Sequence, residues 1–368
     1  KFVPITGNLE QMKYFFEALK QSSNKKIRIA HYGDSLVQGD IITEYIREKF
    51  QDRFGGKGAG FLNIVSNDIR MRNTTIHSFS DNWEYASIIT RNPNQIPFGI
   101  SGAVSIPRVN SWVKYETSNH LKSTRFFEKV EMYYSNGDET TSFQYTVNGK
   151  VIGKVSLEKG EEVKVVSIPI TGNGTSIELK FLGGKAPYVY GVSLESNHGI
   201  YVDNFPMPGN SGVSLLEIPE RKLQEFDKLM DYGLIILTYG ANVNAPNRGI
   251  YTLYENKMLA AIQQFKKAFP KTSILLVSVG DKTMKRGNKF ITNPDVPILL
   301  ETQKRIVEKG NIAFWNMWEA MGGNNSMEDW VNSAPPMALK DYSHFTTVGG
   351  ERIAQLLFES LMDQYQKK

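Results

Sequence analysis

The side chains best suited to chemistry in this sequence are a serine near one end of the chain and an aspartate and a histidine near the other. Ser35 follows a short strand-like run at 27–31, and Asp341 and His344 lie three positions apart. A serine hydroxyl becomes a good nucleophile when an imidazole removes its proton, and that imidazole needs a carboxylate on its other ring nitrogen. Asp341 and His344 in one tight loop would supply both groups. The three residues therefore predict acyl transfer through Ser35.

Acyl transfer also needs hydrogen-bond donors aimed at the oxygen that becomes negatively charged. Asn242 follows an apolar run at 234–238, and an amide held at a strand end donates without adding a charge. The loop at 203–212 contains Gly209 and Gly212, and a glycine lets its own N–H approach such an oxygen closely. The sequence therefore offers an amide and a glycine N–H as candidate donors.

Each of these residues also has an ordinary structural interpretation. Asp34 and Ser35 could cap the helix that follows them, and Asn242 could complete a turn. Asp341 could likewise be a turn residue and His344 a contact at the start of the last helix. The other histidines are not part of an Asp-x-x-His pair: His31, which we expect to pack inside its strand, and His77, His120 and His198 in the middle of the chain.

The elements that must position these residues alternate between strands and helices. Near the start we expect a helix at 9–20, a strand at 27–31 and a helix at 41–50. From residue 215 onward we expect helices at 219–230, 253–269, 297–308 and 347–365, with strands at 234–238, 273–279 and 312–315. This alternation predicts an α/β fold with a parallel sheet flanked by helices. Ligand sites in such sheets lie at the carboxyl ends of the strands, where Ser35 and Asn242 would meet.

Between residues 65 and 203 the pattern changes to alternating residues rich in Val, Ile, Thr, Tyr and Phe. We expect strands at 126–134, 142–147, 151–155, 163–168 and 176–181, with a hairpin turn at Asn148-Gly149. An antiparallel β-sandwich is the simplest packing for such strands. The sequence thus predicts one discontinuous α/β domain, residues 1–64 and 204–368, interrupted by an inserted β-sandwich domain at 65–203.

Composition excludes several classes of function. The 43 Lys and Arg against 38 Asp and Glu give a net charge of +5 but cluster no further than doublets such as Lys25-Lys26, so we expect no nucleic-acid partner. The absence of cysteine excludes disulfides and thiolate chemistry. No apolar run approaches the ~20 residues that span a bilayer, so we expect no transmembrane segment. The sequence begins at Lys1 without a Met, and we expect an exported protein whose signal peptide is not included.

The four segments occur in the order serine, glycine loop, asparagine and Asp-x-x-His, and as a set they resemble the SGNH or GDSL-like hydrolase superfamily. The resemblance covers the α/β half of the chain and implies a flavodoxin-like sheet. It also implies that Ser35 is the nucleophile and that Asp341 and His344 complete its triad. The expected oxyanion hole consists of the Ser35 N–H with Gly209 and Asn242.

The glycine assignment follows from the same resemblance. Gly209 lies five residues after Asn204, as in many family members, and Gly212 is the alternative. The family block around Asn242 usually continues with an acidic residue, where this sequence has Val243.

An insert between the first two blocks is similar to the arrangement in bacterial peptidoglycan O-acetylesterases and related carbohydrate esterases, where a carbohydrate-binding-module-like β-sandwich interrupts the hydrolase. The resemblance implies removal of O-acyl groups, expected to be O-acetyl, from a carbohydrate or cell-wall glycan through an acyl-enzyme on Ser35. It implies no metal or organic cofactor. A lipid or thioester acylhydrolase, an acyltransferase and a non-catalytic glycan-binding protein are the alternatives, and the oligomeric state is left open.

Aromatic residues add two further hypotheses. Those of the middle segment either stack on sugar rings or fill its core, with the core favoured: Trp83, Tyr85, Trp112 and Tyr115. The aromatic segment at 314–318 either walls the active-site cleft or packs in the interior.

Overall fold

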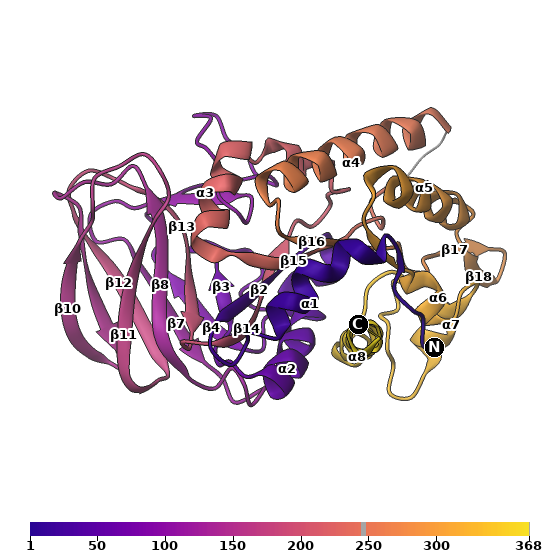
Figure 1. Cartoon of the computed structure of the whole chain (residues 1–368), viewed down its shortest axis with the longest axis horizontal. Helices are drawn as coiled ribbons and strands as arrows, with labels where there is room; N and C mark the ends of the chain where they lie inside the picture. Colours follow the sequence, from indigo (N-terminus) through magenta and orange to yellow (C-terminus); the bar gives the residue numbers. More distant parts are fainter. Residues whose placement is uncertain (244–247, 368) are drawn as a thin grey trace.

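The structure is a computed structural model that describes residues 1–243 and 248–367. A mostly parallel sheet flanked by helices forms one half of the molecule, and antiparallel sheets form the other half (Figure 1). Within the described ranges, no helix is both long enough and apolar enough to cross a membrane.

The parallel sheet is built around strand β2 (Lys26–Gly33). Its order is β1-β19-β16-β15-β2-β14, and every neighbouring pair is parallel except the edge pair of β1 and β19. The other strands are β1 (Thr6–Gly7), β14 (Gly199–Pro206), β15 (Tyr232–Thr238), β16 (Ser273–Val277) and β19 (Ala313–Trp315). Successive β2 side chains enter cores on opposite faces, so Ile29 packs on one side and Tyr32 on the other. This buried sheet confirms the α/β fold predicted from the sequence.

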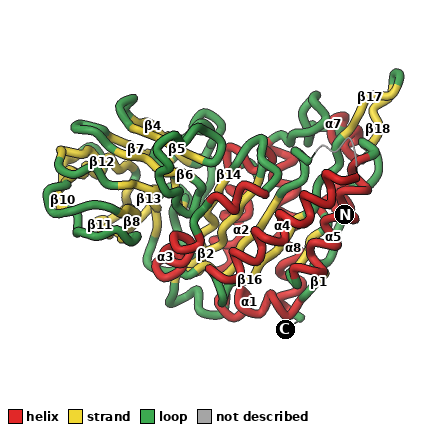
Figure 2. The backbone as a smooth tube through the Cα atoms, turned by 90° about the horizontal axis from the view of Figure 1, so that it is seen from above, coloured by secondary structure: helices red, strands yellow, loops and turns green. Residues whose placement is uncertain are grey.

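Helices cover both faces of this sheet (Figures 1 and 2). One face packs against α1 (Lys13–Leu19), α2 (Thr43–Phe54) and α8 (Thr347–Gln366), which share a core cluster with Ile29. The other face packs against α3 (Glu220–Met230), α4 (Arg248–Ala268) and α5 (Asp295–Gly310), which share a cluster with Tyr32. The short helices are α6 (Met317–Met321), α7 (Ser326–Asn332), and the 3-10 helices η1 (Leu9–Met12), η2 (Ser35–Asp40) and η3 (Val213–Glu217).

The antiparallel half consists of two sheets packed face to face. One sheet has the order β10 (Lys150–Ser156), β9 (Ser142–Val147), β12 (Ser176–Gly183), β7 (Trp112–Thr117) and β4 (Thr75–Phe79). The other has the order β11 (Lys164–Gly174), β8 (Phe127–Ser135), β13 (Tyr188–Glu195), β6 (Ala103–Ile106) and β5 (Glu84–Ser87), with β3 (Gly60–Leu62) also paired to β13. Buried residues of both sheets, including Leu179 of β12 and Met132 of β8, belong to one core cluster.

A buried ion network lies where the two halves meet. Arg28 of β2 contacts Asp203 of β14 at 2.9 Å and also contacts Glu195 of β13, and all three side chains are buried. The Tyr232 hydroxyl donates to Asp203 at 2.6 Å. Because β14 begins at Gly199, the boundary expected after residue 203 falls inside a strand of the parallel sheet. The two halves are therefore joined by paired charges across adjoining strands.

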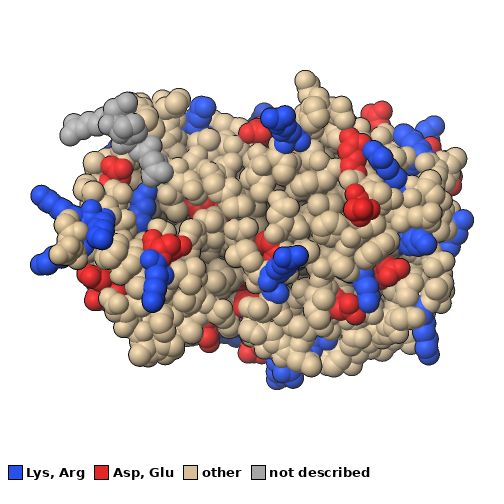
Figure 3. All heavy atoms as spheres, turned by 180° about the vertical axis from the view of Figure 1, so that it is seen from behind, with Lys and Arg blue, Asp and Glu red and all other residues tan. Residues whose placement is uncertain are grey.

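A small hairpin stands out from the α/β half. It consists of β17 (Thr283–Arg286) and β18 (Lys289–Thr292), which the sequence patterns did not predict. Figure 2 shows it projecting beyond the neighbouring α7. In Figure 3, positive and negative side chains alternate over most of the visible face, while Lys and Arg gather at the edge formed by this hairpin.

Candidate active site

Ser35 lies at the carboxyl end of strand β2, as the sequence predicts. It is the first residue of η2, and the Asp34 carboxylate caps that helix by accepting the Leu36 N–H at 2.9 Å. A side chain at Gly33 would place its Cβ 2.6 Å from Val37, so only glycine allows the strand to turn this tightly. The turn exposes the Ser35 hydroxyl at the edge of the sheet. Its N–H, at the start of a helix, has no partner within that helix.

The structure brings Ser35, His344 and Asp341 together. Ser35 Oγ lies 2.9 Å from His344 Nε2, and His344 Nδ1 lies 2.8 Å from Asp341 Oδ2. Because a carboxylate only accepts hydrogen bonds, Nδ1 carries the proton and Nε2 is free to accept one from the serine. The arrangement can therefore move a proton off the Ser35 hydroxyl.

The loop that holds the aspartate and the histidine is fixed by its own backbone. Asp341 Oδ1 accepts the N–H groups of Ser343 at 2.9 Å and His344 at 3.0 Å, and the Leu339 N–H donates to the His344 carbonyl at 2.8 Å. Partial burial would raise the pKa of Asp341, but these bonds and the His344 ring lower it overall. The carboxylate therefore stays ionised beside the imidazole, although 43% of the His344 side chain and 47% of the Asp341 side chain are exposed.

A cavity of about 180 Å³ opens in front of the serine. Ser35, Asn242 and His344 line it, together with the segment at 279–282 that follows β16. The Asn242 amide nitrogen donates to the Asn210 carbonyl at 3.3 Å, which orients the amide. An amide carries two N–H groups, so the second can be donated to an oxygen in the cavity. The structure thus places the predicted asparagine beside the predicted nucleophile.

The two candidate glycines differ in their surroundings. Gly209 is not among the residues that line the cavity, but it has a φ of +78° and nothing within 4 Å of its Cβ position. The N–H of Gly212 already donates to Asn210 Oδ1 at 2.8 Å, and its α-carbon packs against Tyr239 and Met258. Gly212 is therefore a packing residue whose N–H is occupied, and Gly209 is the better candidate donor.

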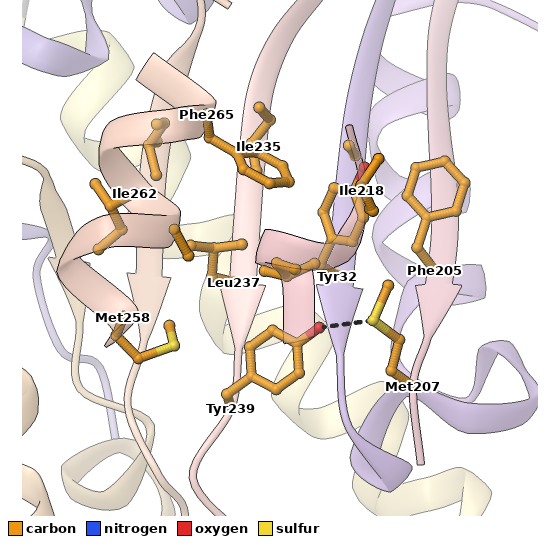
Figure 4. Packing of buried hydrophobic residues seen from close by; sticks show 14 of the residues in the cluster. Tyr32, Phe205, Met207, Ile218, Ile235, Leu237, Tyr239, Met258, Ile262 and Phe265 are labelled. Atoms are coloured by element: carbon orange, nitrogen blue, oxygen red, sulfur yellow. Dashed lines mark hydrogen bonds between the residues drawn. The ribbon is translucent and has the colours of Figure 1, made fainter. Parts of the chain in front are cut away.

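The loops that carry these donors are tied to each other in the core (Figure 4). The Tyr239 hydroxyl, just before the asparagine loop, lies 3.6 Å from the sulfur of Met207, just before Gly209. The Met207 N–H donates to the Gly33 carbonyl at 2.7 Å. Val243, where the resembling family usually has an acid, is buried and its N–H donates to the Gly240 carbonyl at 3.2 Å. The turn after β15 is thus closed without that acid.

No protein-family model and no curated protein sequence matches the chain. A solved structure of a peptidoglycan O-acetylesterase matches 99% of this chain and 99% of its own, with a TM-score of 0.79 and 22% sequence identity. The chain has the fold of this esterase. A family two carbohydrate esterase from Cellvibrio japonicus matches 80% of this chain and 98% of its own at 8% identity, and a salicylyl-acyltransferase of a tetracycline biosynthetic pathway matches 82% and 97% at 12% identity. Their TM-scores of 0.30 and 0.36 are too low to carry an argument.

The structure assigns Asp34 a larger role than the helix cap considered from the sequence. It is fully buried, and besides capping η2 it accepts the Ala241 N–H at 3.2 Å. Burial raises its pKa to about 6, although these bonds and the nearby His344 oppose the rise. Its sequence position beside Ser35 indicated only a cap, because the contact with Ala241 spans 207 positions.

Lys282 is a second residue of the site that was not identified from the sequence. It lines the cavity, and its ammonium group donates to the Ala241 carbonyl at 3.3 Å. Burial lowers its pKa, with the carboxylates of Asp295 and Asp34 opposing. No sequence signal marked it, because it lies beyond the end of β16 in a stretch with no recognised motif.

The structure bears on several further sequence hypotheses. His31 is packed, as expected, between the hydroxyls of Thr43 at 2.8 Å and Thr238 at 2.9 Å, and burial lowers its pKa to about 3. Trp83 and Tyr115 belong to the core of the antiparallel sheets, whereas Tyr85 and Trp112 are half-buried and lie outside that core cluster. None of the residues at 314–318 lines the cavity, and Trp315 is fully buried in the core. Among the described residues, no group of three or more His, Asp or Glu side chains could hold a metal ion.

Proposed function

We propose that the protein is a serine esterase that removes O-acetyl groups from a carbohydrate or cell-wall glycan. The observation that carries the proposal is the unbroken relay from Ser35 through His344 to Asp341, with contacts of 2.9 and 2.8 Å. The fold shared with a peptidoglycan O-acetylesterase supports the choice of an ester as substrate. That esterase's named substrate, peptidoglycan, is the first glycan to test.

In the first half of the reaction, His344 Nε2 takes the proton of Ser35 as the serine oxygen attacks the acetyl carbonyl carbon. The carbonyl oxygen gains a negative charge and accepts hydrogen bonds from the Ser35 N–H and the Asn242 amide. We assign a third donor to the Gly209 N–H. Collapse of this intermediate breaks the bond to the sugar oxygen, which receives its proton from His344.

In the second half, a water molecule attacks the acetyl group held on Ser35. His344 takes a proton from the water and returns one to the serine as acetate leaves. Asp341 holds the same ring tautomer throughout and stabilises the imidazolium that forms in each half. The chain's own residues supply each proton transfer in this scheme.

The cavity supports a short acyl group. At about 180 Å³ it is smaller than the ~300–1,000 Å³ of pockets that enclose drug-sized ligands, and polar groups of Ser35, Asn242 and Lys282 line it. An acetyl group fits such a space, whereas a long lipid chain needs an apolar trough. The sugar ring would remain outside, against the exposed rim.

We further propose that the two antiparallel sheets form an inserted β-sandwich domain, carbohydrate-binding-module-like in arrangement, within a discontinuous α/β domain. The strand pairings support boundaries near residues 60 and 198, because β3 pairs with β13 and β14 pairs with β2. A substrate in the cell wall would also fit the export expected from the sequence.

The experiment that tests this function compares ester hydrolysis by the wild type and by Ser35→Ala. We expect p-nitrophenyl acetate turnover to fall at least about 10³-fold, because the nucleophile is removed. Ser156→Ala, at an exposed serine on β10, is the matched control and should keep wild-type turnover. Acetyl, butyryl and octanoyl esters in parallel separate a short-chain esterase from a lipid acylhydrolase. Equal rates for the wild type and Ser35→Ala would refute the proposal.

A further inference from the structure

The hairpin formed by β17 and β18 is attached directly to the catalytic cavity. It follows the cavity-lining segment at 279–282, and its base is closed where the Thr292 hydroxyl donates to Asp281 Oδ1 at 2.8 Å and the Asn293 N–H donates to the Lys282 carbonyl at 2.8 Å. Asp281 is itself buried and also accepts the Met327 N–H at 2.9 Å. The base of the hairpin is therefore rigidly held.

The same hairpin contacts the loop that carries His344. The ring of Phe290 stacks on the ring of Tyr342 with centroids 3.8 Å apart and planes 11° apart, and the Thr283 N–H points to the Tyr342 carbonyl at 3.4 Å. Tyr342 lies between Asp341 and His344 and has a φ of +56°, an unusual backbone for a tyrosine. The hairpin thus packs against the loop that carries two members of the triad, and it begins at the edge of the cavity.

The hairpin carries positive charge and no acidic residue of its own. Residues 283–292 contain no Asp or Glu, although Asp281 and Asp295 flank the hairpin. The side chains of Lys285, Arg286 and Lys289 are exposed, and none forms an ion pair with any residue in the described part of the chain. Figure 3 shows Lys and Arg gathered at this edge of the molecule, while both signs are mixed elsewhere on that face. Exposed unpaired cations beside a catalytic cavity attract anionic ligands.

Lys282 extends this charge into the cavity. It lines the same space as Ser35 and is held by its hydrogen bond to the Ala241 carbonyl at 3.3 Å. The positively charged side chains therefore run from Lys282, whose partly buried ammonium group is in the cavity wall, to Arg286 and Lys289 at the tip of the hairpin. We call residues 282–292 the cationic arm.

We propose that the cationic arm is a binding site for carboxylate groups of an acetylated glycan, which it holds while the acetyl group enters the cavity. The inference rests on the proposed esterase function and specifies its substrate as an acidic glycan, one with carboxylates on the sugars or on attached peptides. The arm recognises charge rather than the acetyl group. It should therefore act on substrate binding and leave the chemical step at Ser35 unchanged.

The test uses one glycan with and without its charge. Insoluble O-acetylated peptidoglycan, whose peptides carry carboxylates, is compared with the same material after the carboxylates have been converted to amides, and acetate release is measured. The arm variant is Lys285→Gln/Arg286→Gln/Lys289→Gln. The matched control is Lys150→Gln/Lys154→Gln/Lys159→Gln, three exposed lysines of the antiparallel half.

We expect the arm variant to lose about tenfold in kcat/KM on the charged glycan, within the range of electrostatic steering, and to keep wild-type kcat/KM on the amidated glycan and on p-nitrophenyl acetate. The wild-type preference for the charged glycan should shrink when the salt concentration is raised to about 0.5 M, because salt screens exposed charges. The control variant should match the wild type on every substrate.

Binding separates failure of this inference from failure of the esterase proposal. All forms are also prepared with Ser35→Ala and sedimented with the two glycans. Loss of binding to the charged glycan by the arm variant supports the arm even if no turnover is detected, in which case only the esterase proposal fails. Equal binding and equal kcat/KM for the arm variant and the wild type on the charged glycan would overturn the arm while leaving esterase activity intact.

Discussion

The buried carboxylate of Asp34 accepts the N–H of Ala241 at 3.2 Å. This bond joins the turn that carries Ser35 to the turn that carries Asn242, so the nucleophile and its proposed oxyanion donor are held by one side chain. The site is therefore preorganised before any ester enters it.

Asp34 should make stability depend on pH. Burial raises its pKa from 3.8 to about 6, so the folded state disfavours its ionised form. A raised carboxyl pKa contributes stability below about pH 4 that is lost as the pH rises through about 6. We expect the free energy of unfolding of the wild type to fall by about 2 to 3 kcal/mol relative to Asp34→Asn between pH 4 and pH 7. Urea denaturation at both pH values measures the free energy of unfolding. The same change between pH 4 and pH 7 in the wild type and in Asp34→Asn would contradict the prediction.

Replacing Asp341 by asparagine should reduce catalysis while leaving the fold intact. Asparagine cannot hold the imidazole in the tautomer whose Nε2 accepts the serine proton, which predicts a fall in kcat of about 10²- to 10⁴-fold. Near-half exposure of both side chains lets water assist the ring, so we expect the lower part of this range. Asp81→Asn, at an exposed position, is the control. Unchanged kcat in Asp341→Asn would remove Asp341 from the triad.

The two glycines should respond differently to alanine. Gly212→Ala places a Cβ 2.9 Å from Tyr239 and 3.0 Å from Met258, at a φ of +95°, and should cost about 3 kcal/mol of unfolding free energy. Gly209→Ala meets no neighbour and should cost only about 1 kcal/mol for its positive φ. Alanine keeps the backbone N–H, but relief of the positive φ would turn that N–H away from the cavity. If Gly209 donates to the oxyanion, kcat of Gly209→Ala should therefore fall while KM changes little. A greater loss of stability in Gly209→Ala than in Gly212→Ala would reverse this assignment.

The ion network between the two halves should be essential for folding. Arg28→Met removes the cation and leaves the buried Asp203 without a cationic partner and the buried Glu195 with Lys26 alone, which predicts a loss of about 3 to 5 kcal/mol. Chemical denaturation measures this loss. Lys25→Met is the control, because the pair of Lys25 with Asp231 is exposed and should contribute under about 1 kcal/mol. Equal stability of the two variants would mean that the network is not required.

Sequence patterns predicted the parallel sheet because its strands are short apolar runs between amphipathic helices. Strand β14 was missed because Asp203 and Asn204 give it the composition of a loop. In the structure Asp203 forms an ion pair with Arg28, 175 positions away, and Asn204 Oδ1 accepts a hydrogen bond from the Thr43 hydroxyl at 2.8 Å. Polar residues are found in a buried strand only when such partners exist. Partners that are distant in the chain cannot be identified from a local sequence pattern.

More of the candidate triad than of the surrounding surface could be predicted from the sequence. Ser35, Asp341 and His344 could be found because their chemistry requires a fixed set of residue types in short motifs. Lys282 and the cationic arm could not, because surface lysines are common and only the fold places these beside the cavity. The turn residues Arg286-Gly287-Asn288-Lys289 are consistent with a hairpin, but the flanking strands are too short to stand out from the sequence.

Ser35 and His344 are 309 positions apart. During synthesis, Ser35 is made long before His344. A partial chain that ends before residue 344 has the nucleophile without its general base, so it has no triad. The proposed hydrolysis can begin only when the loop that carries Asp341 and His344 has docked beside Ser35. In a refolding experiment, activity should therefore appear no earlier than the docking of this loop.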